Sequence, residues 1–181
     1  MARKWSNLNL PGALHFVTGN CLERTPVFVE PACCNAFLQE LKSLNEKWPS
    51  KLIAYVLMPD HFHLISNPRD GRIKEFVGAL KSLSAKSIVN VCKQFRFHAD
   101  AGGRQVWQES FKALPLWSGW MIWQKINYIH ANPVKAGIAK SAKDYRCSQG
   151  EESLAVDHDW WWSDDAEKLA LAVKQMGWHR Q

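Results

Sequence analysis

Residues 51–67 contain the pattern that most restricts the fold of this chain. Two largely apolar runs, "KLIAYVLM" and "HFHLISN", stand on either side of a Pro59-Asp60 dipeptide. Pro and Asp favour tight turns, and β-prone runs on both sides of a turn predict an antiparallel hairpin. Because both runs are largely apolar, we expect this hairpin to lie in the interior of a sheet.

Two histidines, His61 and His63, interrupt the second run of the hairpin. Side chains at i and i+2 of a strand point to the same face, so both imidazoles should project together, away from Phe62 and Leu64. Neutral imidazole is a common ligand of divalent metals. The pair therefore indicates a metal site, and the alternative is that one or both rings only bond to backbone at a strand edge.

The remaining segments predict an α+β domain. Residues 12–20 are strand-like, residues 31–48 and 71–95 have helical apolar spacing, a short strand is expected around 105–114, and residues 118–137 predict a helix that breaks at Pro133. This order matches a ferredoxin-like split β-α-β layout, in which an antiparallel sheet carries its helices on one face.

Length and composition favour one domain with an appended tail. The chain has 181 residues and a hydrophobic share of 46%, and we divide it into a domain at 1–150 and a Trp-rich tail at 151–181. No segment has the apolar length of a membrane span and the first residues lack the core of a signal peptide, so we expect a cytoplasmic protein. The five cysteines form no C-x-x-C pair, which favours reduced thiols.

The charge points to a polyanionic partner. The net charge is +6 with a pI near 9.1, and ten tryptophans offer rings that can stack on bases as well as form a core. Lysines of the second helix either face phosphate or simply keep that helix solvated. The candidate DNA-binding residues are Lys74, Lys81, Lys86, His130 and Lys135.

Tyr128 and Asn132 form a second candidate pair. They lie at i and i+4, so both occupy one face of the predicted helix 118–137. The spacing alone is equally consistent with a packed tyrosine ring and an asparagine that caps the helix before Pro133.

The two signatures together resemble a known family. "VLMPDHFHLI" and "YIHANPVKAG" are similar, in this order and at this separation, to the paired motifs of single-tyrosine HUH transposases, and most closely to the bacterial REP-associated tyrosine transposases. The likeness includes "GALHFVTGN" and "VWQESF" and extends over residues 10–150. Where the family usually has a tryptophan and a second serine, this chain has Cys147 and Gln149.

The resemblance implies a fold, an activity and roles for individual residues. The fold would be that of HUH endonucleases, with His61, His63 and Asn132 holding Mg²⁺ or Mn²⁺ and Tyr128 as nucleophile. The reaction would be cleavage and joining of single-stranded hairpin (REP, palindromic) DNA through a 5′-phosphotyrosine, during DNA transposition. A phenol is mostly protonated at neutral pH, so a metal that polarises the phosphate and a rigid helix that aligns the tyrosine would both assist the attack.

Other classes are weighed against this reading. A barrel metallohydrolase needs a longer chain, and a relaxase or replication initiator fits the small size and the motif order less well. The main alternative is a domesticated protein that binds DNA hairpins without cutting them. The resemblance also implies a nucleoid-associated protein that needs no membrane and acts as a monomer rather than a homodimer.

The tail contains three consecutive tryptophans, Trp160, Trp161 and Trp162, between acidic residues. Three adjacent rings cannot all face one core from a regular helix or strand. They predict a stacking platform for bases, a plug over the DNA groove whose carboxylates imitate phosphate, or a cover for an apolar patch.

Overall fold

The computed structural model describes residues 7–92, 99–100 and 103–145 of the chain, and every structural statement below refers to these. Cys147, Gln149 and the whole Trp-rich tail at 151–181 lie outside this part, so the predictions made for the tail remain predictions. No helix in the described ranges is both long and apolar enough to cross a membrane.

An antiparallel sheet forms the centre of the domain. Its strands are β1 (Leu14–Asn20), β2 (Ser50–Met58), β3 (His61–Pro68) and β6 (Lys112–Leu116), in the spatial order β2-β3-β1-β6. The predicted hairpin is confirmed: β2 and β3 are antiparallel neighbours joined at Pro59-Asp60, and β3 is an interior strand. A second, two-stranded sheet consists of β4 (Ala99–Asp100) and β5 (Gly103–Arg104).

Two helices cover one face of the four-stranded sheet. Helix α1 (Pro31–Lys47) begins at a proline, whose missing N–H costs nothing in a first turn, and it ends just before Pro49. Helix α2 (Ile73–Val91) lies beside α1. Their buried residues share one apolar cluster with Val17, Leu57 and Phe62 of the sheet.

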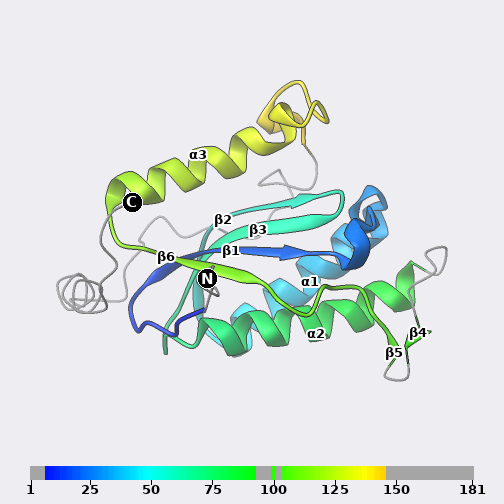
Figure 1. Cartoon of the computed structure of the whole chain (residues 1–181), viewed down its shortest axis with the longest axis horizontal. Coiled ribbons are helices and arrows are strands. Elements are labelled where there is room, and N and C mark those ends of the chain that lie inside the picture. The colour runs from blue at the N-terminus through cyan, green and yellow to red at the C-terminus, as the bar shows by residue number, and fades with distance from the viewer. Residues whose placement is uncertain (1–6, 93–98, 101–102, 146–181) are drawn as a thin grey trace, which may run out of the picture.

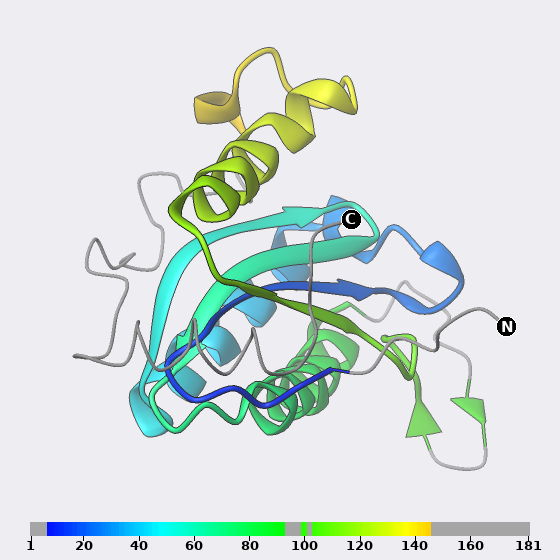
Figure 2. The ribbon, with the colours of Figure 1, turned by 60° about the vertical axis from the view of Figure 1, so that its left-hand side comes forward.

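Helix α3 (Gly119–Lys135) covers the opposite face, as Figures 1 and 2 show. The α+β antiparallel class is confirmed, but the prediction that the helices share one face needs correction. Eight of the nine residues of β2 are buried, so side chains on both faces of the strand are shielded from water. The hairpin therefore needs a helical layer on each side. Ile122, Ile126 and Ile129 of α3 supply that cover.

Helix α3 also continues further than predicted. Pro133 lies inside it, and the helix ends at Lys135. The proline is tolerated because only two helical residues follow, and the turn is closed by bonds from the N–H of Ala136 to Asn132 O (3.0 Å) and of Gly137 to Val134 O (3.0 Å). Gly137 has a φ of 70°, the left-handed conformation that often terminates helices.

Shorter elements connect the layers. They are the 3₁₀ turns η1 (Leu22–Arg24), η2 (Val27–Val29) and η3 (Ala142–Asp144). The strand expected around residues 105–114 begins only at Lys112, because Val106 and Trp107 instead leave the sheet to pack into the α1–α2 cluster.

The structure brings Cys33, near the start of α1, against Cys92, just after α2, with 6.2 Å between their Cα atoms, a separation that a disulfide can bridge. Their separation of 59 residues carried no signal, because only the packing of α1 along α2 brings them together. The prediction of reduced thiols stays a prediction. Cys21 and Cys34 are buried, and the Cys34 thiol donates to Phe28 O at 3.2 Å.

Candidate active site

His61 and His63 occupy the face of β3 that α3 covers. Their ring centroids lie 4.8 Å apart, which confirms that both imidazoles project to one side. His63 is 5% exposed, and His61, nearer the Pro59-Asp60 turn, has a side chain that is 14% exposed. The pair therefore lies at the rim of the sheet, with one ring buried and the other partly open.

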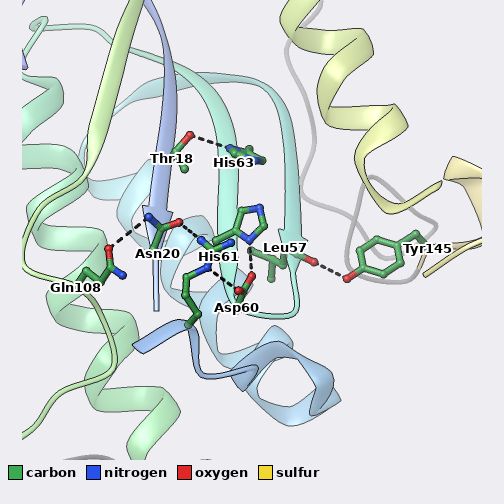
Figure 3. A network of polar contacts seen from close by, with 9 residues as sticks. Thr18, Asn20, Leu57, Asp60, His61, His63, Gln108 and Tyr145 are labelled. Carbon is green, nitrogen blue, oxygen red and sulfur yellow. Dashed lines mark hydrogen bonds and ion pairs between the residues drawn. The ribbon is translucent and has the colours of Figure 1, made fainter. Parts of the chain in front are cut away.

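Each ring is held through its Nδ1 atom (Figure 3). His63 Nδ1 lies 2.9 Å from Thr18 Oγ1, across the β1–β3 register that pairs these two residues. His61 Nδ1 lies 2.5 Å from Asp60 Oδ1. Fixing Nδ1 leaves Nε2 of each ring as the nitrogen available for another partner.

The electrostatics favour a neutral His63. Burial lowers its pKa to about 3, and the nearby positive charges of His61, Lys125 and Arg24 act in the same direction. The Nε2 atom of His63 is buried and has no hydrogen-bond partner among the described residues. A neutral ring with a fixed Nδ1 and an orphaned Nε2 has the protonation and geometry of a metal ligand, so these residues fit the divalent ion that the sequence predicted.

Tyr128 approaches this pair from α3. Its ring meets His63 edge-on at a centroid distance of 5.3 Å and Phe16 at 5.8 Å. The tyrosine remains 39% exposed, so its hydroxyl can be reached by a large substrate. Residues that lie 65 positions apart in the sequence thus form one site between the sheet and α3.

A cation lies beside the tyrosine. Lys125 Nζ is 4.9 Å from the ring centroid of Phe16 and 5.6 Å from that of Tyr128. Lys125 precedes Tyr128 by three residues and so shares its helix face. The ammonium therefore places a positive charge beside the ring of Tyr128.

Asn132 lies one turn beyond Tyr128, and no partner for its buried Nδ2 atom is found in the part of the chain that the structure describes. The contacts recorded for the described residues do not join it to either histidine. Nor do these residues contain a cluster of three or more His, Cys, Asp or Glu side chains that could hold a metal. The role of Asn132 as third ligand therefore stays a prediction.

The structure corrects the assignment of Lys81 as a DNA-binding residue. Lys81 is 9% exposed, and its Nζ donates to the carbonyls of Gln108 (2.6 Å), Glu109 (3.0 Å) and Ser110 (3.3 Å). Burial lowers its pKa, opposed by the charge of Glu109. Its ammonium organises the loop before β6 and is not available to a phosphate.

The other DNA-binding candidates are not gathered at the site. Lys74 and Lys86 are exposed, but they lie on α2, behind the sheet from Tyr128. His130 and Lys135 are on α3, half-buried and exposed respectively. Any DNA contact by these four residues stays a prediction.

Four polar residues at the site were missed by sequence reasoning: Thr18, Arg24, Asp60 and Lys125. Two of them could have been predicted from their position in the sequence, since Asp60 directly precedes His61 and Lys125 is one helical turn from Tyr128. Thr18 and Arg24 had none, because their positions depend on the strand register and on the turn after β1.

Comparison with known proteins agrees with this geometry. Residues 12–132, more than half of the chain, match the family model described as "Transposase IS200 like". The chain belongs to the IS200-like transposase family. The matched segment contains His61, His63, Tyr128 and Asn132, whereas Lys135 lies beyond it.

Individual members of this transposase family extend the match. A predicted REP-associated tyrosine transposase of Haemophilus influenzae is 25% identical over 158 residues, covering 82% of this chain and 88% of that protein. A solved REP-associated tyrosine transposase bound to a REP hairpin superposes with a TM-score of 0.65 at 20% identity, covering 80% of this chain and 81% of the other. The resemblance to REP-associated tyrosine transposases is confirmed.

A second solved structure, a predicted transposase from Deinococcus radiodurans, has a TM-score of 0.50 at 22% identity and covers 70% of this chain and 95% of the other. At these identities the two structural matches show the fold, and the roles of single residues rest on the geometry described above.

Proposed function

We propose that this transposase cuts and rejoins single-stranded hairpin DNA, with Tyr128 as the nucleophile and His61 and His63 as ligands of Mg²⁺ or Mn²⁺. The observation that carries the proposal is the contact between the ring of Tyr128 and the ring of His63, at 5.3 Å, beside a buried and unpartnered Nε2. The hairpin substrate is supported by the solved relative, whose bound partner is a REP hairpin.

The reaction follows from the side chains present. The Tyr128 oxygen forms a bond to the phosphorus of a phosphodiester and loses its proton, while the bond from phosphorus to the 3′-oxygen breaks and that oxygen leaves as a 3′-hydroxyl. A divalent ion, when bound, withdraws charge from the phosphate oxygens and lowers the barrier to this attack. The phosphotyrosine retains the energy of the phosphodiester, so the reverse step can join a new 3′-hydroxyl without ATP.

The two other tyrosines of the chain are less suited than Tyr128 to act as the nucleophile. Tyr55 is 1% exposed within the core, and the hydroxyl of Tyr145 donates to Leu57 O at 2.7 Å. Only Tyr128 combines an exposed ring with a place beside the histidines. The charge of Lys125 lies beside Tyr128, and the side chain of His61 is partly exposed, so a phosphate backbone can approach the tyrosine from this side.

The test is formation of a covalent adduct with a labelled single-stranded hairpin in Mn²⁺, detected after denaturation. Tyr128→Phe should abolish the adduct and leave hairpin binding intact, because only a hydroxyl is removed. Tyr145→Phe is the matched control and should still form the adduct, because it keeps the apolar contacts that hold α3 on the sheet. An adduct with Tyr128→Phe would refute the assignment of the nucleophile.

The metal is tested separately. His61→Ala combined with His63→Ala should abolish cleavage while hairpin binding persists, because binding depends on phosphate and base contacts elsewhere. Full cleavage by the double variant in Mn²⁺ would refute the metal site. If the wild-type protein binds hairpins but never cleaves in any divalent metal, the non-catalytic alternative holds. Gel filtration with and without the hairpin tests the further proposal that the protein acts as a monomer.

A further inference from the structure

A chain of polar contacts leads away from the candidate metal ligand His61. Asp60 contacts His61 Nδ1 through Oδ1 and the Nε of Arg24 through Oδ2, the latter at 2.7 Å. Arg24 Nη1 in turn donates to Asn20 Oδ1 at 2.6 Å, and Asn20 Nδ2 donates to Gln108 Oε1 at 3.4 Å. Figure 3 shows Asn20 to the left of the Asp60–His61 pair, with Gln108 beyond it on the same side.

Arg24 reaches this position through an uncommon backbone. Glu23 and Arg24 have φ values of 52° and 57°, the left-handed region that L residues rarely adopt, and no other non-glycine in the described ranges does so. Bonds on both sides hold the turn, from the N–H of Cys21 to Asp60 O (2.8 Å) and of Leu22 to Val106 O (2.8 Å). Such strain persists only where surrounding contacts enforce it, and it concentrates at functional sites.

The contacts explain what the strained turn achieves. A carboxylate next to an imidazole can rotate, and an arginine that binds its second oxygen fixes that rotation with a planar, directional donor set. Asn20 fixes the guanidinium from the other side, and Asn20 is also the register partner of His61.

We propose that Arg24 is a positioning residue of the metal centre, which acts through Asp60 to orient His61 so that its Nε2 can bind a divalent ion together with His63. This inference rests on the proposed function, because it assigns a supporting residue to that site. Outer residues that orient a metal-binding histidine typically change metal affinity by about 10- to 100-fold when they are removed.

The test is the affinity of the full-length protein for Mn²⁺ alone, measured by titration calorimetry in the absence of DNA. Arg24→Asn is the informative variant, because asparagine tolerates a positive φ and the turn should keep its backbone. Arg72 provides a matched control: its Nε binds Asp70 Oδ2 at 2.9 Å, and its side chain is 57% exposed against 51% for Arg24, but it lies at the start of α2.

Arg24→Asn should raise the Mn²⁺ dissociation constant about tenfold, and Arg72→Asn should leave it unchanged. Cleavage by Arg24→Asn should be reduced at low Mn²⁺ and restored at saturating Mn²⁺. Asp60→Asn should weaken Mn²⁺ binding at least as much as Arg24→Asn. Because Arg24 acts through Asp60, the double variant should bind no more weakly than Asp60→Asn alone, which is not expected if both residues merely stabilise the fold.

The outcomes separate this inference from the proposed function. If His61→Ala abolishes Mn²⁺ binding while Arg24→Asn stays within twofold of wild type, the inference is overturned and the metal site stands. Additive losses in the double variant also overturn it. If His61→Ala leaves Mn²⁺ binding unchanged, the metal site itself is refuted, and the role of Arg24 with it.

Discussion

Replacing Lys81 by methionine would distinguish a structural lysine from a DNA-binding one. Methionine keeps the length and the apolar stem of the side chain and removes only the ammonium. In the native protein that ammonium donates to three successive carbonyls, Gln108, Glu109 and Ser110, and it lies 5.6 Å from the centroid of the Phe111 ring. The substitution therefore removes the donor that holds the loop before β6 to helix α2.

The expected loss follows from these contacts. A hydrogen bond to a charged group contributes roughly 1.5–3 kcal/mol net. The bond to Gln108 is the shortest, at 2.6 Å, and Gln108 is half-buried. Its carbonyl therefore loses the most free energy when the ammonium is removed, because water replaces the lost bond least well there. Glu109 and Ser110 are exposed, and water can replace much of what they lose. Burial of the ammonium also costs free energy, which the variant recovers, so we expect a net loss of about 2 kcal/mol.

Urea unfolding at pH 7 measures this loss, and a chain of this size should melt roughly 4–8 °C lower for it. Lys86→Met, at an exposed position of the same helix, is the control and should change stability by less than about 0.5 kcal/mol. The slope of log affinity for the hairpin against log salt concentration should not change in Lys81→Met. If Lys81 contacted a phosphate, its loss would reduce the magnitude of that slope by about one unit. A stability change as small as that of Lys86→Met, together with a shallower salt slope, would refute the structural role.

Two further predictions concern the core. Burial lowers the pKa of His15 to about 4, so the folded protein keeps it neutral while the unfolded chain binds a proton below about 6.5. The free energy of unfolding in urea should therefore fall as the pH drops from 6.5 to 4, with His15 contributing up to roughly 3 kcal/mol, and His15→Gln should reduce that dependence to the part that His63 contributes. A Cβ added at Gly19 would lie 2.6 Å from Cζ of the buried Phe62, so Gly19→Ala should lower the free energy of unfolding by about 1–3 kcal/mol in the same assay. The control is Gly78→Ala, whose added Cβ meets no atom within 4 Å and which should be neutral or stabilising. Equal stabilities of the two alanine variants would contradict the close approach of β1 to Phe62.

The parts of the fold that sequence could predict are those that short-range patterns encode. The Pro59-Asp60 hairpin, the extent of α1 and the shared face of His61 and His63 all follow from periodicity and turn chemistry within a few residues. The presence of α2 follows in the same way, but the helix ends at Val91, before the predicted end at residue 95. The covering of both sheet faces was missed, although a near-continuous apolar run such as 51–58 is typical of a strand buried on both sides.

Contacts between distant segments could not be predicted in the same way. A lysine on an amphipathic helix normally faces water, and the carbonyls that bury Lys81 come from a loop 27–29 residues further along. Likewise Arg24 meets Asp60 only because two residues adopt a left-handed backbone that their sequence does not favour. Polar residues that act on a site from outside it therefore remain the hardest to find by sequence reasoning.

The distance between Tyr128 and His63 is set by the packing of α3 on the sheet, since the two residues belong to different layers. Ile122, Ile126 and Ile129 fix the helix against Val56 and Ile65 of the hairpin. The segment that leaves α3 is tied to the same hairpin, because the Tyr145 hydroxyl donates to the carbonyl of Leu57, three residues before Asp60. The helix that carries Tyr128 and the segment that follows it are thus both anchored to the hairpin that carries the histidines. Small changes in this apolar interface should therefore disturb the alignment of nucleophile and metal ligands while leaving each motif intact.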